Sequence, residues 1–331
     1  MQAERLAGSF CCGSHVSLVH VRSRDRTMAG HIALLLTAIA CGAAVVRADN
    51  ATSVVLGQLR PDGIVVPFAS CNSSKWSTVS TKYFDRHEDS RWFAFKADGR
   101  VDTLRGGEWL ETISDPDGDG GTFHGQMTDY DSRDSSGLGR PTVGVVVSEY
   151  RSGVPFEIVN EGSDTWRRLM KHLAPEFDRL EAEQVARSGA RDAGADVLWW
   201  GHPLADEARS SFPAKAQITR VAVDDDAVLF HATVSREYPP PPRDEGCPGN
   251  TVFNAWLLER SARVSVIDSQ LVIDNCDQKS VDVETPLIAL FLEGRTFVVV
   301  DDVGYEWGAY QVLEWKNGGL RRVHEYAYHC L

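Results

Sequence analysis

The C-terminal part of the chain alternates short apolar runs with tight-turn sequences, and this pattern limits what it can fold into. Glu293-Gly294 and Asn317-Gly318-Gly319 separate the runs. Asn-Gly readily takes the positive φ angles of a two-residue hairpin, so neighbouring runs are expected to pair as antiparallel strands. The four runs, which together predict a β-meander, are residues 287–292, 296–300, 307–315 and 320–328.

The third of these strands has two faces, because side chains alternate along a strand. One face holds Trp307, Ala309, Gln311, Leu313 and Trp315. The other holds Gly308, Tyr310, Val312 and Glu314. We expect the first of these faces to lie against the core.

Two earlier parts of the chain show the same pattern of strands and turns. Arg60-Pro61-Asp62-Gly63 has the composition of a turn and separates two apolar runs. Asp224-Asp225-Asp226 likewise separates strands predicted at 214–223 and 227–235. Residues 114–140 are rich in Gly, Asp and Ser and predict a long loop.

One segment, residues 163–188, has helical periodicity. Its apolar residues recur every three or four positions and share one face, which we interpret as core packing. Ser163 or Asp164 can cap its start, and Pro175 predicts a kink or a second helix. A further short helix is expected at 190–199. The apolar stripe consists of Trp166, Leu169, Met170, Leu173, Phe177 and Leu180.

These patterns predict a mainly β protein with a helical insertion, an α+β fold of antiparallel sheets that ends in a β-meander. We expect a signal segment at 1–48, an N-terminal β-rich region at 49–160, a helical segment at 161–200 and a C-terminal β-rich region at 201–331. The chain shows no repeat of blade length, which argues against a β-propeller.

The first 48 residues have the composition of a cleaved secretory signal. Three arginines between residues 22 and 26 precede the apolar run Ile32–Val46, which has the length of a signal core and is short for a membrane span. Val46-Arg47-Ala48 predicts cleavage before Asp49, so no transmembrane helix is expected in the mature chain. Ala38-Ile39-Ala40-Cys41 is a competing lipoprotein site, and Met28 is an alternative start.

The mature chain is strongly acidic. The whole sequence has a net charge of −13, and residues 49–331 hold 29 basic and 45 acidic side chains, a net charge of −16. This charge repels nucleic acids and anionic lipid headgroups, so we expect no nucleic-acid partner. Solubility alone accounts for the charge.

Four cysteines remain after the predicted cleavage: Cys71, Cys247, Cys276 and Cys330. In an oxidising compartment they predict two disulfides, and three pairings are open. Short loops favour Cys247–Cys276 together with Cys71–Cys330. None of the four lies in a Cys-x-x-Cys sequence, so a zinc knuckle is not expected.

The clearest metal-binding pattern is Asp115-Pro116-Asp117-Gly118-Asp119-Gly120. Alternate carboxylates followed by Gly resemble the start of a calcium loop, in which hard oxygen ligands converge and Gly permits a sharp turn. The resemblance implies calcium ligands at Asp115, Asp117 and Asp119, with Gln126 in place of the usual bidentate Glu. The alternative interpretation is a solvated acidic turn.

Catalytic motifs give no assignment. The chain has no Gly-x-Ser-x-Gly elbow and no P-loop, and His324 and His329 are five apart, on opposite faces of the predicted strand. All nine tryptophans lie in the mature chain, and the pair Trp199-Trp200 has the chemistry to stack on sugar rings. Core packing is the other interpretation of these aromatic residues.

Two stretches carry a resemblance to a group of proteins. Leu59–Phe68 followed by Trp76 is similar to the start of the mature region in exported bacterial proteins of unknown function. Gly294–Phe297 followed by Gly304-Tyr305-Glu306 resembles their closing β-segment. The resemblance implies export and a β-rich fold, and it implies no activity.

We therefore expect a periplasmic or extracellular protein without enzymatic activity, a binding or structural module whose partner is a glycan or a surface protein. Calcium is the one cofactor that the residues suggest. The alternative is an exported hydrolase whose acid pair is assembled from distant strands.

Overall fold

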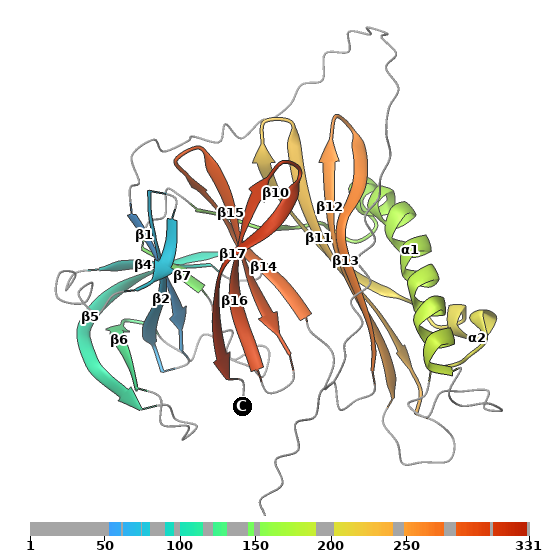
Figure 1. Ribbon diagram of the computed structural model, residues 1–331, viewed down its shortest axis with the longest axis horizontal. Coiled ribbons are helices and arrows are strands. Elements are labelled where there is room, and N and C mark those ends of the chain that lie inside the picture. Colours follow the sequence, from blue (N-terminus) through green and yellow to red (C-terminus); the bar gives the residue numbers. More distant parts are fainter. Residues whose placement is uncertain are drawn as a thin grey trace, which may run out of the picture. The chain divides into compact units, whose positions relative to one another are not determined.

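The computed structural model describes residues 53–60, 62–73, 75–79, 90–95, 100–114, 122–130, 145–148, 153–189, 202–240, 248–274, 283–304 and 307–329. The protein is mainly β, as predicted, and its strands form three antiparallel sheets (Figure 1). The predicted signal segment lies outside these residues, so its cleavage and the export of the chain stay predictions.

A closed barrel of six strands forms the N-terminal part. Its strands are β1 (Ser53–Leu59), β2 (Ile64–Asn72), β4 (Arg91–Phe95), β5 (Val101–Ser114), β6 (Thr122–Thr128) and β7 (Val145–Val147). The ring order is β1-β7-β4-β5-β6-β2, and the pairing of β2 with β1 closes the ring. A further strand, β3 (Lys75–Thr78), pairs with β2 outside the ring. The predicted turn at 60–63 joins β1 to β2, and Gly63 supplies the positive φ of 80° that this turn needs.

The barrel surrounds a buried core that includes Trp92 and one polar side chain, Gln126. The Trp92 Nε1–H donates to Gln126 Oε1 at 2.9 Å, and Gln126 Nε2 donates to the Gly107 carbonyl at 3.0 Å. These bonds satisfy both ends of the amide, which is the condition for burying it. The apolar members of this core are Val55, Leu59, Val65, Trp92, Ala94, Leu104 and Val146.

The second sheet contains the predicted meander. Its order is β17-β16-β15-β14-β8, with β8 (Gly153–Pro155), β14 (Val283–Leu292), β15 (Arg295–Val303), β16 (Trp307–Lys316) and β17 (Gly319–His329). One of its faces packs with barrel residues; Phe68, for example, stacks on Tyr310 at 5.3 Å between ring centroids. Its other face contributes Ala289, Val298 and Val300 to a core shared with the third sheet.

The sheet is buried on both faces, so the expectation that one face of β16 lies against the core is only part of the result. On the predicted face Ala309 is buried, and the half-buried Leu313 and Trp315 pack against the core shared with the third sheet. The opposite face, with Tyr310, Val312 and Glu314, is also buried. Burial of this opposite face was not expected, because a charged side chain such as Glu314 normally lies in solvent. Its carboxylate is instead paired with Arg295 and Arg321.

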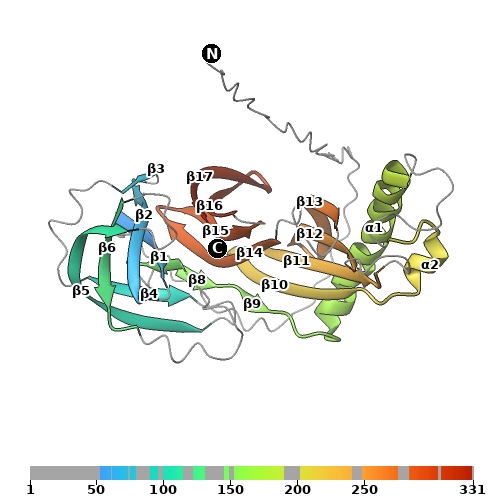
Figure 2. The same cartoon turned by 90° about the horizontal axis from the view of Figure 1, so that it is seen from below.

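The third sheet carries the helix. Its order is β13-β12-β11-β10-β9, with β9 (Glu157–Ile158), β10 (Lys215–Asp224), β11 (Ala227–Tyr238), β12 (Gly249–Arg260) and β13 (Arg263–Asp274) (Figure 2). The helix α1 (Asp164–Gly189) packs on one face of this sheet, and α2 (Asp206–Ser210) precedes β10.

Helix α1 begins as predicted and runs through Pro175. Ser163 caps it, since the Trp166 N–H donates to Ser163 Oγ at 3.2 Å. Pro175 lies on the exposed side of the helix, and the helix continues past it to Gly189. The predicted apolar stripe is core packing, with Leu169, Leu173 and Phe177 fully buried.

Candidate functional site

The third sheet has two faces of opposite character. On the side of α1, β11 and β12 place only apolar side chains in the centre, among them Phe230, Val234 and Phe253. Because side chains alternate along a strand, the residues between these point to the other face. That second face is the candidate functional site, and its composition changes along the strands.

A row of uncharged polar residues crosses the second face. The strand register places Gln217 of β10 opposite Thr233 of β11, Thr233 opposite Asn254 of β12, and Asn254 opposite Gln270 of β13. We call these four residues the amide row. Gln217 is exposed, Thr233 and Gln270 are half-buried and Asn254 is buried. Within the row, Thr233 Oγ1 donates to Asn254 Oδ1 at 3.2 Å.

The neighbouring row contains a histidine, a tryptophan and a carboxylate brought from another sheet. His231 and Trp256 are cross-strand partners with ring centroids 4.7 Å apart. Glu284 of β14 reaches both: its Oε2 accepts from Trp256 Nε1 at 2.9 Å and lies 3.6 Å from His231 Nε2. Burial acts to raise the pKa of Glu284, but His231 and the indole N–H outweigh it and hold this pKa below its ordinary value.

A second carboxylate stands beside Glu284. The register of β14 and β15 sets Asp302 directly opposite Glu284, so both side chains are on the same face of that sheet. Asp302 is buried, and its Oδ2 accepts from Gln311 Nε2 at 2.7 Å. The register therefore sets Asp302 beside the carboxylate that contacts His231, in the row next to the amide row.

On the helix side, a buried ionic network fixes α1 and α2 to the same sheet. Glu181 of α1 accepts from Arg236 and from the Tyr238 hydroxyl, the latter at 2.6 Å, and Arg236 also donates to Asp178 at 2.9 Å. Arg209 of α2 lies 3.9 Å from the Glu181 carboxylate. Burial, and then the bond to Glu181, raise the pKa of Tyr238 above its ordinary value. The network links both helices to the sheet on the side opposite the second face.

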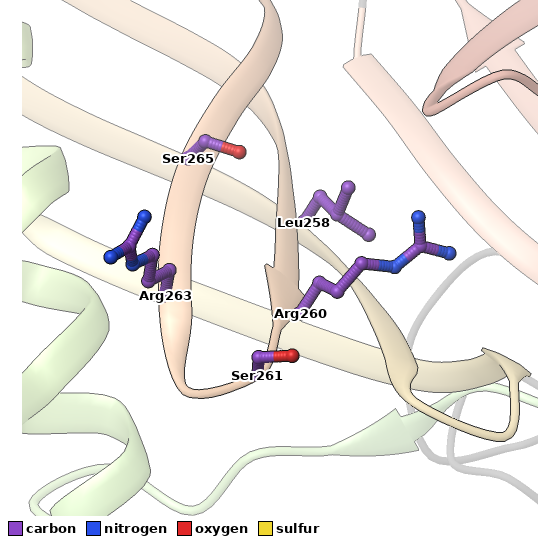
Figure 3. A pocket seen from close by; sticks show the side chains of 5 residues that line it. All are labelled: Leu258, Arg260, Ser261, Arg263 and Ser265. Atoms are coloured by element: carbon purple, nitrogen blue, oxygen red, sulfur yellow. The ribbon is translucent and has the colours of Figure 1, made fainter. Parts of the chain in front are cut away.

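An open pocket of about 520 Å³ lies at the tip of the β12–β13 hairpin. Its lining includes Arg260 and Arg263, whose side chains point away from one another in Figure 3. Arg260 is within 3.4 Å of Asp226 and 3.6 Å of Asp224. Guanidinium groups that diverge, one of them already paired, do not converge on an anion, so this pocket is not the candidate site.

Most residues singled out in the sequence lie outside the described part of the chain. They are Asp115, Asp117, Asp119, Trp199, Trp200, Cys247, Cys276 and Cys330. Cys71 is buried in β2, and Gln126 has the barrel contacts given above. The calcium loop, the stacking tryptophans and the two disulfides therefore stay predictions. Within the ranges that the structure describes, no three His, Cys, Asp or Glu side chains gather as metal ligands.

The sequence did not point to the residues of the second face. Thr233, Asn254 and Gln270 alternate with buried apolar residues, which is also the pattern of an ordinary solvent-facing strand. Their alignment in one row depends on the register of four strands. A scan for amide side chains at alternate positions of neighbouring strands is the one sequence signal that would have found them.

Comparison with models of protein families, with curated proteins and with solved structures finds no match to this chain. Neither helix in the described ranges has both the length and the apolar character that a membrane crossing requires.

Proposed function

We propose that this protein is an exported, non-enzymatic module that binds a glycan on the second face of its third sheet. The observation that carries the proposal is the amide row, Gln217, Thr233, Asn254 and Gln270, on a sheet whose other face is apolar and covered by α1. The periplasmic or extracellular location is part of the same proposal and rests on the N-terminal sequence.

The chemistry of the row suits a sugar. A carboxamide carries both donors and an acceptor, and a hydroxyl also does both, which matches the hydroxyl groups of a carbohydrate. Polar residues in regular rows on a rigid sheet lose little side-chain freedom when they bind. Trp256 is buried and held by Glu284, so its role is to shape the face rather than to stack on the ligand.

Retention on insoluble polysaccharides, followed by titration with the soluble form, tests the proposal. Gln217→Ala and Gln270→Ala each remove one or two hydrogen bonds to the ligand, and we expect affinity to fall roughly 2- to 10-fold per variant. Gln184→Ala on α1 is the matched control, because it removes the same group outside the face. Binding that survives in both row variants, or that falls equally in the control, would contradict the assignment.

The acid pair supports a second candidate function, hydrolysis of the bound glycan. Side chains directly opposite on paired strands have Cβ atoms about 5 Å apart, which is compatible with the carboxyl separation of a retaining glycosidase. In this role Asp302 and Glu284 would supply the acid and the nucleophile. Reducing-end release from the retained polysaccharide, abolished in Glu284→Gln and in Asp302→Asn while binding persists, would establish the enzyme over the binding module.

A further inference from the structure

We infer that the ligand is an uncharged linear polymer whose internal segment lies across the strands along the amide row. This inference rests on the proposed function and names the class and the direction of its ligand.

The direction follows from what borders the row on either side. Toward one end of the strands, the next positions on β12 and β13 are the cross-strand pair Val252 and Val272. Toward the other end they are Trp256, which is buried, and Asp268, which is exposed. Polar side chains thus continue from strand to strand but not along β12. A chain that lies across the strands meets the exposed Gln217 and the half-buried Thr233 and Gln270, whereas on β12 the row residue, Asn254, is buried.

The length of the row requires an extended ligand. Neighbouring strands lie about 4.8 Å apart, so the four positions span about 14 Å, more than a single sugar ring covers. The half-buried Val272 beside the row gives the apolar face of a sugar ring a surface to pack on. Affinity is therefore expected to rise with the length of the oligosaccharide until the ligand spans the row.

Both ends of the row are open within the described residues. Strand β9 pairs with Thr219 and Arg220 of β10, so no β9 residue stands opposite Gln217. At the other end, Gln270 lies on β13, the edge strand of the sheet. A ligand that enters the row can continue past it in both directions, which suits the interior of a polymer rather than its terminus.

The charges around the row exclude a polyanion. The row itself holds no cation. Asp268 lies in the next row, where Glu284 accepts from Trp256 and Asp302 stands opposite Glu284 on β15. On the other side of the amide row, the adjacent row holds Lys215, which is paired with Glu237 at 3.6 Å. A uronate or sulfate group on the ligand would meet these carboxylates, whereas the flanking Lys215 is already paired, in a chain that is acidic as a whole.

Affinity electrophoresis in matched gels tests this inference. The neutral probes are hydroxyethyl cellulose, galactomannan and dextran, and the anionic probes are carboxymethyl cellulose and polygalacturonate. We expect retardation by at least one neutral polymer and by neither anionic one. For the polymer that binds, oligosaccharides from the monosaccharide upward should bind more tightly with length, and Gln217→Ala and Gln270→Ala should remove the gain seen with the longer ones.

The outcomes separate the inference from the proposed function. Two outcomes would overturn the inference but keep the glycan site, provided that the row variants still lose binding. One is a preference for an anionic polymer, and the other is an affinity that does not rise beyond one sugar. Retardation by none of the probes, or retardation unchanged in both row variants, would overturn both. Gln184→Ala is the control throughout.

Discussion

Replacing Glu181 by Gln should remove a large part of the stability of this protein. The Glu181 carboxylate is buried and holds two buried partners, the Arg236 guanidinium and the Tyr238 hydroxyl. The Glu181→Gln change removes the carboxylate charge and leaves the Arg236 cation buried without its main counter-ion. Breaking a buried pair in this way costs about 3–5 kcal/mol. Arg236 keeps its bond to Asp178 at 2.9 Å, so we expect the lower end, about 3 kcal/mol.

Urea unfolding followed by tryptophan fluorescence measures this loss. With an m value of about 3 kcal/mol/M, the midpoint should fall by about 1 M. Tyr238→Phe removes one bond to a charged acceptor and should cost about 1.5–3 kcal/mol. Glu183→Gln is the matched control, because its half-exposed ion pair with Arg179 on the same helix is worth roughly 0.3–0.5 kcal/mol. A Glu181→Gln loss no larger than the control would refute the network as the anchor of α1.

Three other properties can be measured on the same protein. The pKa of Glu284 is lower in the folded than in the unfolded protein, so its carboxylate stabilises the fold above about pH 4.3. This contribution is lost as the pH falls through the folded pKa. The stability of Glu284→Gln should therefore change less with pH across this range. Gly153→Ala places a Cβ against Ile288 and should cost about 1–3 kcal/mol in urea unfolding, whereas Gly319→Ala meets open space and should be near neutral. If the predicted calcium loop binds calcium, a concentration 100 times the dissociation constant stabilises the fold by roughly 2.7 kcal/mol. Millimolar calcium should then raise the melting midpoint by several degrees relative to chelator, and Asp117→Ala should abolish this shift.

Local features were read correctly from the sequence because neighbouring residues decide them. The turn at 60–63 and the Asn-Gly hairpin at 317–319 form where Gly and Asn permit positive φ. The helix begins at its Ser163 cap, and its stripe faces the core because 3.6 residues make one turn. The antiparallel order of the last four strands follows from connections too short for a crossover.

Closure of the barrel could not be predicted from any local sequence pattern. It depends on β7 pairing with both β1 and β4, and these strands are far apart along the chain. Each strand by itself is consistent with an open sheet. The second sheet is a similar case, since only the contacts of both its faces explain why Glu314 is buried between two arginines.

The candidate site was decided by tertiary structure for the same reason. Four ordinary polar residues become one row only when four strands adopt a single register, and Glu284 meets His231 and Trp256 only when β14 approaches the third sheet. The sequence by itself determined the strands, the turns, the helix and the acidic charge, because these depend on residues within a few positions of one another. Pairing between distant strands, and with it the site, depends on packing energy that the whole chain shares.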